Sequence, residues 1–141
     1  MRDDLMRDER GTTTLWVLGL CLCLLFLGGA VLDLWRVVEE RRALAAMADA
    51  AAAAGTNGLD EDALRRGETT LDPRAAERLA LDQLRREGDR ADIADSWVTA
   101  TDTTVRVEVV GTVDFSLLGI FVGGDPIEVH ARAEAEPRRI P

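Results

Sequence analysis

The chain has 141 residues, of which 26 are acidic and 17 are basic, so its formal net charge is −9. An acidic chain with three Trp, three Phe and no Tyr is poorly suited to neutralise phosphates or to stack on bases, which argues against nucleic acid as a partner. Apolar residues make up 47% of the chain, but eighteen consecutive uncharged residues run from Leu15 to Leu32. That stretch excludes a simple soluble domain.

Residues 12–35 are predicted to form a transmembrane helix. Eighteen helical residues extend about 27 Å and residues 12–34 about 34 Å, which brackets a bilayer core of about 30 Å. Trp16 and Trp35 would lie about 28 Å apart on this helix, so each can sit at one membrane interface. The lipid bilayer is therefore an expected partner, and residues 1–11 form a short segment before the span.

The same stretch has an alternative interpretation as a secretory signal peptide that is cleaved after Ala30. Two observations argue against it: residues 1–11 carry three Arg against four acids, and apolar residues continue past Ala30. Charge leaves the direction of insertion open, because three Arg precede the span and three follow it, at Arg36, Arg41 and Arg42.

Residues 36–55 are predicted to continue the helix as an Ala-rich stalk, since no helix breaker occurs between Leu32 and Gly55. Nine of the twelve residues from Ala43 to Ala54 are Ala. Either a neighbouring helix backbone approaches this segment closely, or Ala only supplies helix propensity while the globular part covers one face. The sequence leaves both interpretations open.

Residues 56–141 are predicted to form a small α+β domain. Asp72-Pro73 is a strong helix start, with a capping Asp and a Pro at the first helical position, and Gly88 ends this helix. One helical turn is expected at 61–66. The acidic segment 89–95 is expected to be a solvated turn, because it lacks the alternating carboxylates and the Gly of a calcium loop.

An antiparallel sheet of about three strands is predicted in the same domain. Strands are expected at 97–100, around 105–109 and at 127–136, where apolar residues alternate with polar or charged ones. The last run is the most regular, with one apolar and one charged face, so the sheet should pack one face on helices. The apolar segment 115–124 is interpreted either as an exposed or membrane-proximal contact or as part of the core.

No group of residues assembles an active site. The one His, His130, falls on the polar face of a predicted strand, where a solvated role is expected. The chain lacks a Gly-x-Ser-x-Gly turn, a phosphate-binding Gly loop and any Cys/His metal spacing. We therefore expect no enzyme, no cofactor, no metal and no small-molecule substrate.

Three motifs stand out in the N-terminal part: Arg10-Gly11 before the apolar stretch, Val31-Leu-Asp-Leu34 at its end, and Ala48-Asp-Ala-Ala51 with Gly55 beyond. Together they resemble the TadE/TadG-type proteins of Tad (tight adherence, Flp) pilus assembly. The resemblance covers roughly residues 8–55. It implies a pilin-like, single-pass structural or assembly component of the cell membrane, with a cytoplasmic N-terminus, an extracytoplasmic domain, and other pilus or secretion subunits as partners.

The resemblance also raises the question of processing. Prepilin-type cleavage would fall between Gly11 and Thr12, but Trp16 stands where TadE-type prepilins usually carry Glu, and TadG-like members are commonly regarded as uncleaved. The sequence leaves the TadE-like and the TadG-like role open. The alternative to a pilus component is a membrane-tethered or secreted extracytoplasmic binding domain that is unrelated to pili.

Candidate contacts with partner helices are Asp33, Arg36, Ala48, Asp49 and Ala52. Asp33 is singled out because a carboxylate at the end of a membrane helix is costly unless it reaches water or a partner, and Arg36 three residues on could pair with it. Simple solvation of Asp33 at the interface is the other interpretation.

Overall fold

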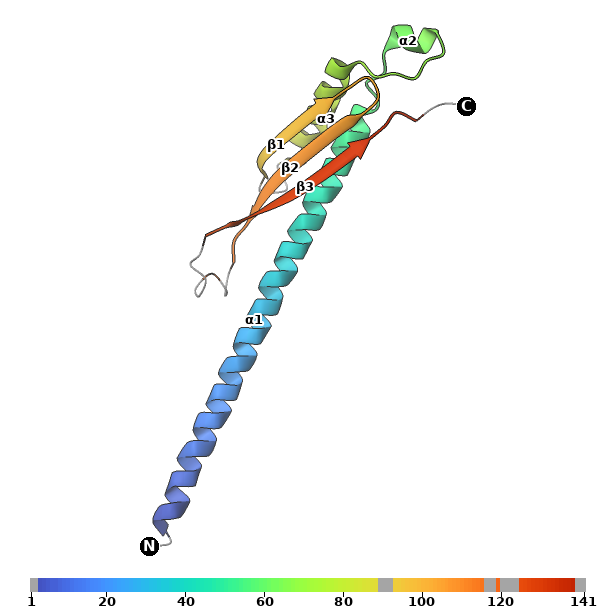
Figure 1. Cartoon of the computed structure of the whole chain (residues 1–141). Coiled ribbons are helices and arrows are strands. Elements are labelled where there is room, and N and C mark those ends of the chain that lie inside the picture. Colours follow the sequence, from blue (N-terminus) through green and yellow to red (C-terminus); the bar gives the residue numbers. More distant parts are fainter. Residues whose placement is uncertain (1–2, 89–92, 116–118, 120–124, 139–141) are drawn as a thin grey trace. The chain divides into compact units, whose positions relative to one another are not determined.

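The structure is a computed structural model that describes residues 3–88, 93–115, 119 and 125–138 (Figure 1). Of residues 3–11 it describes the helical backbone alone. The chain divides into two compact units. The first unit consists of Met1–Trp35 and Phe115–Asp125, and the second consists of Arg36–Asp114 and Pro126–Pro141.

A single helix, α1, runs from Asp3 to Gly55 and contributes to both units (Figure 1). It confirms the predicted continuity of the span and the stalk, and it begins nine residues before Thr12. The helix ends at Gly55. The space around this residue is too crowded for a side chain. A Cβ atom there would lie 2.8 Å from Val105 Cγ1 and 3.2 Å from the carbonyl oxygen of Ala76.

Two further helices belong to the second unit. The short helix α2 covers Glu61–Arg65, and α3 covers Pro73–Glu87. The predicted start of α3 is confirmed: an oxygen of the Asp72 side chain accepts a hydrogen bond from the backbone N–H of Arg74 at 3.0 Å, and Pro73 follows it. The backbone N–H of Gly88 donates to the Leu84 carbonyl, so α3 ends where the sequence predicted.

The described residues form one antiparallel sheet in the order β1-β2-β3, with β1 at Ile93–Ala100, β2 at Val105–Val113 and β3 at Ile127–Ala135. The prediction of an antiparallel sheet of about three strands is therefore confirmed. The prediction of a turn over the whole of 89–95 was wrong for its last three residues, which belong to β1. They belong to the sheet because β2 extends as far as Val113, and Ile93 therefore pairs with Gly111 of that strand. Residues 89–92 lie outside the described part.

One face of the sheet is apolar and the other is charged. Val107, in the middle of the central strand, is opposed by Val98 on one side and by Ala133 on the other, and all three belong to or pack against the core. Most of the intervening residues of β2 and β3 are polar or charged, as in the pair of Arg106 and Glu134, although Val110 of β2 is buried. The sheet thus packs its apolar face on the core, as predicted, and its other face is largely exposed.

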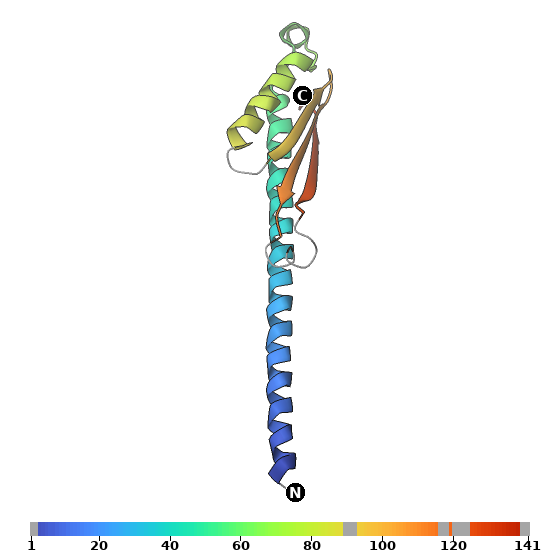
Figure 2. The ribbon, with the colours of Figure 1, turned by 90° about the vertical axis from the view of Figure 1, so that its left-hand side faces the viewer.

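The core of the second unit lies between the apolar face of the sheet and two helices. Figure 2 shows the sheet nearly edge-on, with α3 and the C-terminal part of α1 on the same side of it. Among the fully buried core side chains are those of α1 and the middle strand: Leu44, Ala48, Ala51, Val105, Val107 and Val109. The Ala-rich segment of α1 is thus part of a folded domain, and its small side chains let the helix lie close to the sheet and α3.

Candidate membrane and partner surface

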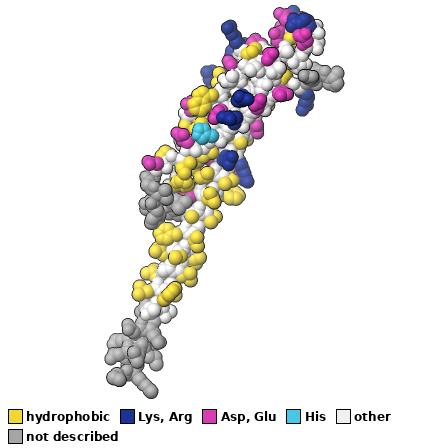
Figure 3. All heavy atoms as spheres, in the orientation of Figure 1, with side chains coloured by type: hydrophobic (Ala, Val, Ile, Leu, Met, Phe, Trp, Pro, Cys, Tyr) yellow, Lys and Arg dark blue, Asp and Glu magenta, His cyan; other side chains and the backbone are white. Residues whose placement is uncertain are grey.

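The first unit presents an exposed apolar helix. Within the described residues, α1 contains the one helix that is long and apolar enough to cross a membrane, and only 6% of its most apolar eighteen-residue window is buried. This low burial separates it from the core helix of a soluble protein, although a signal sequence near an N-terminus has the same properties. Figure 3 shows hydrophobic side chains over this part of α1 and charged side chains gathered on the second unit.

The ends of the apolar stretch carry exposed aromatic side chains. Trp16 is 77% exposed and Trp35 is 63% exposed, so neither ring is used by the chain's own core. Their amphipathic indoles suit the two interfaces of a bilayer. The leucines between them are likewise exposed, among them Leu18, Leu24 and Leu27. This surface is energetically acceptable only against lipid or against other apolar helices.

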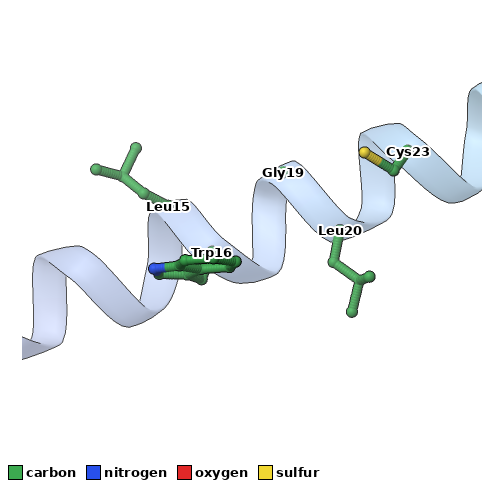
Figure 4. Close-up of a pocket in the computed structure, with 5 residues that line it drawn as sticks. All are labelled: Leu15, Trp16, Gly19, Leu20 and Cys23. Carbon is green, nitrogen blue, oxygen red and sulfur yellow. The ribbon is translucent and has the colours of Figure 1, made fainter.

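A shallow hollow interrupts this surface at Gly19. Figure 4 shows Leu15, Trp16, Leu20 and Cys23 arranged around Gly19, where no side chain projects. A Cβ atom on Gly19 would meet nothing within 4 Å, so the glycine is not required by packing inside the chain. This feature was not predicted from the sequence. The sequence pattern that could have predicted the hollow is the pair of small residues Gly19 and Cys23, which lie four positions apart on one helix face.

Asp33 occupies a special place at the end of the apolar stretch. It is 2% exposed and is the one charged side chain that is buried among the described residues. Asp33 and Arg36 each take part in an interaction within the chain. Simple solvation of Asp33 at the membrane interface was therefore the wrong interpretation, because the residue is covered within the chain.

The other predicted contact residues fall into two groups. Arg36 and Asp49 are exposed on α1, whereas Ala48 is fully buried and Ala52 is 1% exposed. Both alanines belong to the core cluster of the second unit. Of the two interpretations of the Ala-rich segment, the structure favours coverage of one helix face by the globular part. Arg36 and Asp49 are therefore the two predicted contact residues that are exposed.

The candidate processing position lies inside α1. Gly11 and Thr12 are both helical, and Thr12 is exposed and takes part in an interaction within the chain. Four residues further along the same helix, Trp16 is exposed. The structure brings Gly11 and Thr12 into one regular helix with the apolar stretch.

Charged side chains on the exposed face of the sheet in the second unit form ion pairs between neighbouring strands. Arg106 Nη2 lies 2.9 Å from Glu134 Oε2, and Arg132 Nη2 lies 3.0 Å from Glu108 Oε2. The ring of His130 is 57% exposed, with Nδ1 4.0 Å from Glu108 and Nε2 3.8 Å from Glu128. In the part of the chain that the structure describes, no group of three metal-ligating side chains is placed to hold a metal ion.

A second polar surface lies where α2 and α3 begin, and its carboxylates serve the fold. One oxygen of Asp60 accepts hydrogen bonds from the backbone N–H groups of Asp62 and Ala63, at 2.8 and 3.0 Å. The hydrogen bond from Ala63, then that from Asp62, lowers the pKa of Asp60 from its ordinary value. Asp72 caps α3 in the same way. These acidic side chains are helix caps and do not by themselves form a ligand site.

The comparisons with known proteins agree with the N-terminal motifs. The Tad family model, which describes Flp pilus-assembly TadE/G-like proteins, matches residues 11–64. The match contains the whole apolar stretch and the Ala-rich half of α1, so it confirms the resemblance noted in the sequence. No curated protein and no solved structure matches the chain significantly. The family match and the candidate membrane helix together support a Tad-type pilus component.

Proposed function

We propose that this chain is a membrane-anchored, pilin-like structural component of a Tad-type pilus or of a related secretion apparatus. The observation that carries the proposal is the exposed apolar stretch of α1, which lies inside the segment that matches the pilus-assembly family. An apolar helix with only 6% of its most apolar window buried needs lipid or partner helices around it. The other pilus or secretion subunits are the proposed partners.

The proposed architecture is pilin-like because one helix has two roles. The N-terminal part of α1 is exposed and apolar, while residues such as Leu44 and Ala51 in its C-terminal part belong to the core of an α+β domain. A partner that contacts the exposed part therefore acts on the same helix that organises the domain. Such a helix is suited to joining subunits through their spans while their domains stay folded on their own.

The proposed location is the cell membrane, with the N-terminus in the cytoplasm and the domain outside. The Arg residues on the two sides of the span are equal in number, so the orientation rests on the family match. We further infer that residues 1–11 are retained, because Trp16 replaces the Glu found in processed TadE-type prepilins. This absence of cleavage favours a TadG-like role.

A replacement of the span tests the proposed function. Residues 12–32 are exchanged for a membrane helix of equal length and hydropathy from an unrelated protein, and the matched control permutes the residues of the second unit's exposed loop 101–104. A pilus component should keep its membrane level but lose co-purification of the other pilus subunits when the span is exchanged. A tethered binding domain would tolerate any anchor, so undiminished co-purification and pilus formation would contradict the proposal.

A further inference from the structure

The two outer edges of the sheet in the second unit differ in how their backbone groups are used. Because the strand order is β1-β2-β3, β1 and β3 each have one neighbouring strand and one free edge. A free edge presents a row of N–H and C=O groups with which a further strand can pair, and proteins usually block such edges. In this sheet the edge of β1 is blocked and the edge of β3 is not.

The edge of β1 is blocked by side chains and by a bulge. The backbone N–H of Ala100 donates to Glu77 Oε1 at 3.3 Å, and that of Ser96 donates to Asp95 Oδ1 at 2.8 Å. The register between β1 and β2 shifts between Ile93 and Asp95, and α3 packs against the same strand. A further strand would have to displace these acceptors, so β1 is not suited to dock one.

The edge of β3 has none of these features. The strand is nine residues long, contains no Pro and pairs with β2 in an unbroken register from Ile127 to Ala135. Among the residues that the structure describes, no side chain accepts a hydrogen bond from its backbone N–H groups. This strand therefore keeps a regular and unblocked edge, which is the feature that strand addition requires.

The backbone groups at the free edge of β3 follow from the alternation of hydrogen-bonded pairs in antiparallel strands. The N–H of Thr101 donates to the carbonyl of Thr104 at 2.8 Å, where β1 turns into β2. The next pair, Ala100 and Val105, is therefore not hydrogen-bonded, so Val105 directs its N–H and C=O toward Ala135 of β3. Every second residue of β3 is bonded to β2 in this way. The residues between them direct their N–H and C=O groups to the free edge: Glu128, His130, Arg132 and Glu134.

The side chains of these four residues determine which strand can pair with the edge. All four are exposed on the charged face of the sheet. On the β2 side, Glu108 lies opposite Arg132 and Arg106 lies opposite Glu134, with ion pairs of 3.0 and 2.9 Å. A strand on the other side meets the same row of charges, so it needs an acidic residue opposite Arg132 and a basic residue opposite Glu134. In an antiparallel strand these two residues form the pattern basic-x-acidic.

The β3 strand of a second copy does not fit this edge, given the membrane anchor proposed above. Residues 36–55 of α1 belong to the same unit as β3, and the two run in the same direction (Figures 1 and 2). An antiparallel pair of two β3 strands would point the two α1 helices in opposite directions, which two chains with their spans in one membrane cannot adopt. A parallel pair would place the charged face of one sheet on the core side of the other.

We propose that the free edge of β3 docks an extended segment of a different protein, which adds a fourth, antiparallel strand to the sheet. The partner segment is amphipathic. Its outer face carries the basic-x-acidic pattern opposite Glu134 and Arg132, and its other face is apolar, because Ala131 and Ala133 are buried on that side. This surface belongs to the domain and not to the span, so the proposal holds for a pilus component and for a tethered binding domain alike.

Amide hydrogen exchange of the full-length chain in detergent micelles, measured by NMR for single residues, tests this proposal. The probe is a synthetic peptide with the sequence of residues 104–113, because β2 already carries the required pattern at Arg106 and Glu108. With the peptide in excess, the outward amides of β3, such as that of Arg132, should exchange at least about tenfold more slowly. The amide of Ala133, which is bonded to β2, and that of Val98 in β1 should exchange at their original rates.

Three modified peptides provide the matched controls. N-methylation at the positions of Arg106 and Glu108 removes the N–H groups that would face β3 and should abolish the protection. N-methylation at the positions of Val107 and Val109 leaves those N–H groups intact and should preserve it. A peptide that combines Arg106→Glu with Glu108→Arg keeps the backbone but reverses the charges, and it should need at least about threefold more peptide for the same protection.

Four results would overturn the proposal. They are absence of protection with the unmodified peptide, equal protection by the two N-methylated peptides, equal protection by the charge-reversed peptide, and protection of Val98 in place of Arg132. Protection of the outward amides of β3 without any peptide, as the concentration of the chain is raised, would show that a second copy occupies the edge. That result would also overturn the proposal, while leaving the proposed pilus function untouched.

Discussion

A Cβ atom on Gly58 would lie 2.5 Å from the backbone nitrogen of Ala76. The turn that follows α1 therefore rests directly on the backbone of α3, at a distance that no residue with a side chain can adopt. Gly55, three residues earlier, approaches Val105 of β2 almost as closely. Through these two glycines the end of the long helix is fixed against both other layers of the second unit.

Substitution of Gly58 by Ala should destabilise the second unit by about 1–3 kcal/mol, because the added methyl group meets backbone atoms that cannot rotate away. The measurement is the denaturation midpoint of the full chain, followed by circular dichroism. Gly88→Ala is the control, since Gly88 has helical dihedral angles and its nearest contact would be Ile93 at 3.6 Å. A Gly58→Ala midpoint equal to that of Gly88→Ala would contradict the close approach.

Substitution of Leu44 by Ala should cost about 2–5 kcal/mol, which is the usual range for a fully buried leucine. Leu44 is 0% exposed and packs in the core with the sheet, although it lies on the helix that continues into the apolar stretch. Leu64→Ala, at a position that is 45% exposed, is the comparison and should have a much smaller effect. Equal effects would mean that residues 36–55 form a free stalk and not part of the domain.

The stabilisation of α2 by its capping residue, Asp60, should be lost in acid. Asp60 has its pKa below the ordinary value of 3.8, because backbone N–H groups of Ala63 and Asp62 bind its ionised form. A lowered pKa in the folded state means that the cap contributes stability above the unfolded pKa and loses it as the pH falls through the folded pKa. NMR titration of the Asp60 carboxyl should show a midpoint below that of the urea-unfolded chain. A midpoint at or above the unfolded value would disprove the capping role.

The protein extracted from membranes should retain its N-terminal segment. We proposed above that residues 1–11 are retained, and Gly11 and Thr12 continue α1 without a break. The intact mass should therefore correspond to a chain that starts at Met1 or Arg2. A mass that lacks residues 1–11 would show cleavage after Gly11, and one that lacks residues 1–30 would show removal of a signal peptide.

Local signals were sufficient for much of the fold. Asp72-Pro73 predicted the start of α3, and the alternation around Arg132 predicted β3 with its charged face, because both depend on neighbours along the chain. The start of β1 at Ile93 was not predictable in this way. It depends on how far β2 continues past Val109, which is a property of the partner strand and not of the acidic segment itself.

The candidate site was predicted less completely, for a physical reason. An exposed apolar helix follows from composition, but the burial of Asp33 at the end of that helix could not be predicted from its neighbours along the chain. Similarly, Ala48 suits a partner helix and an internal core equally well, since a small side chain permits close approach to either. Only the fold shows that Ala48 lies in the chain's own core.

The orientation of the chain across the membrane tests the central claim most directly. Single cysteines are introduced at Thr103, in the exposed β1–β2 turn, and at Asp8, before the apolar stretch, with Cys21 and Cys23 replaced by Ala. Sealed spheroplasts are then treated with a maleimide that does not cross membranes. A membrane-anchored component with its domain outside predicts labelling at position 103 in sealed spheroplasts and labelling at position 8 only after detergent. Labelling at both positions without detergent, or recovery of the protein in the soluble fraction, would contradict the account.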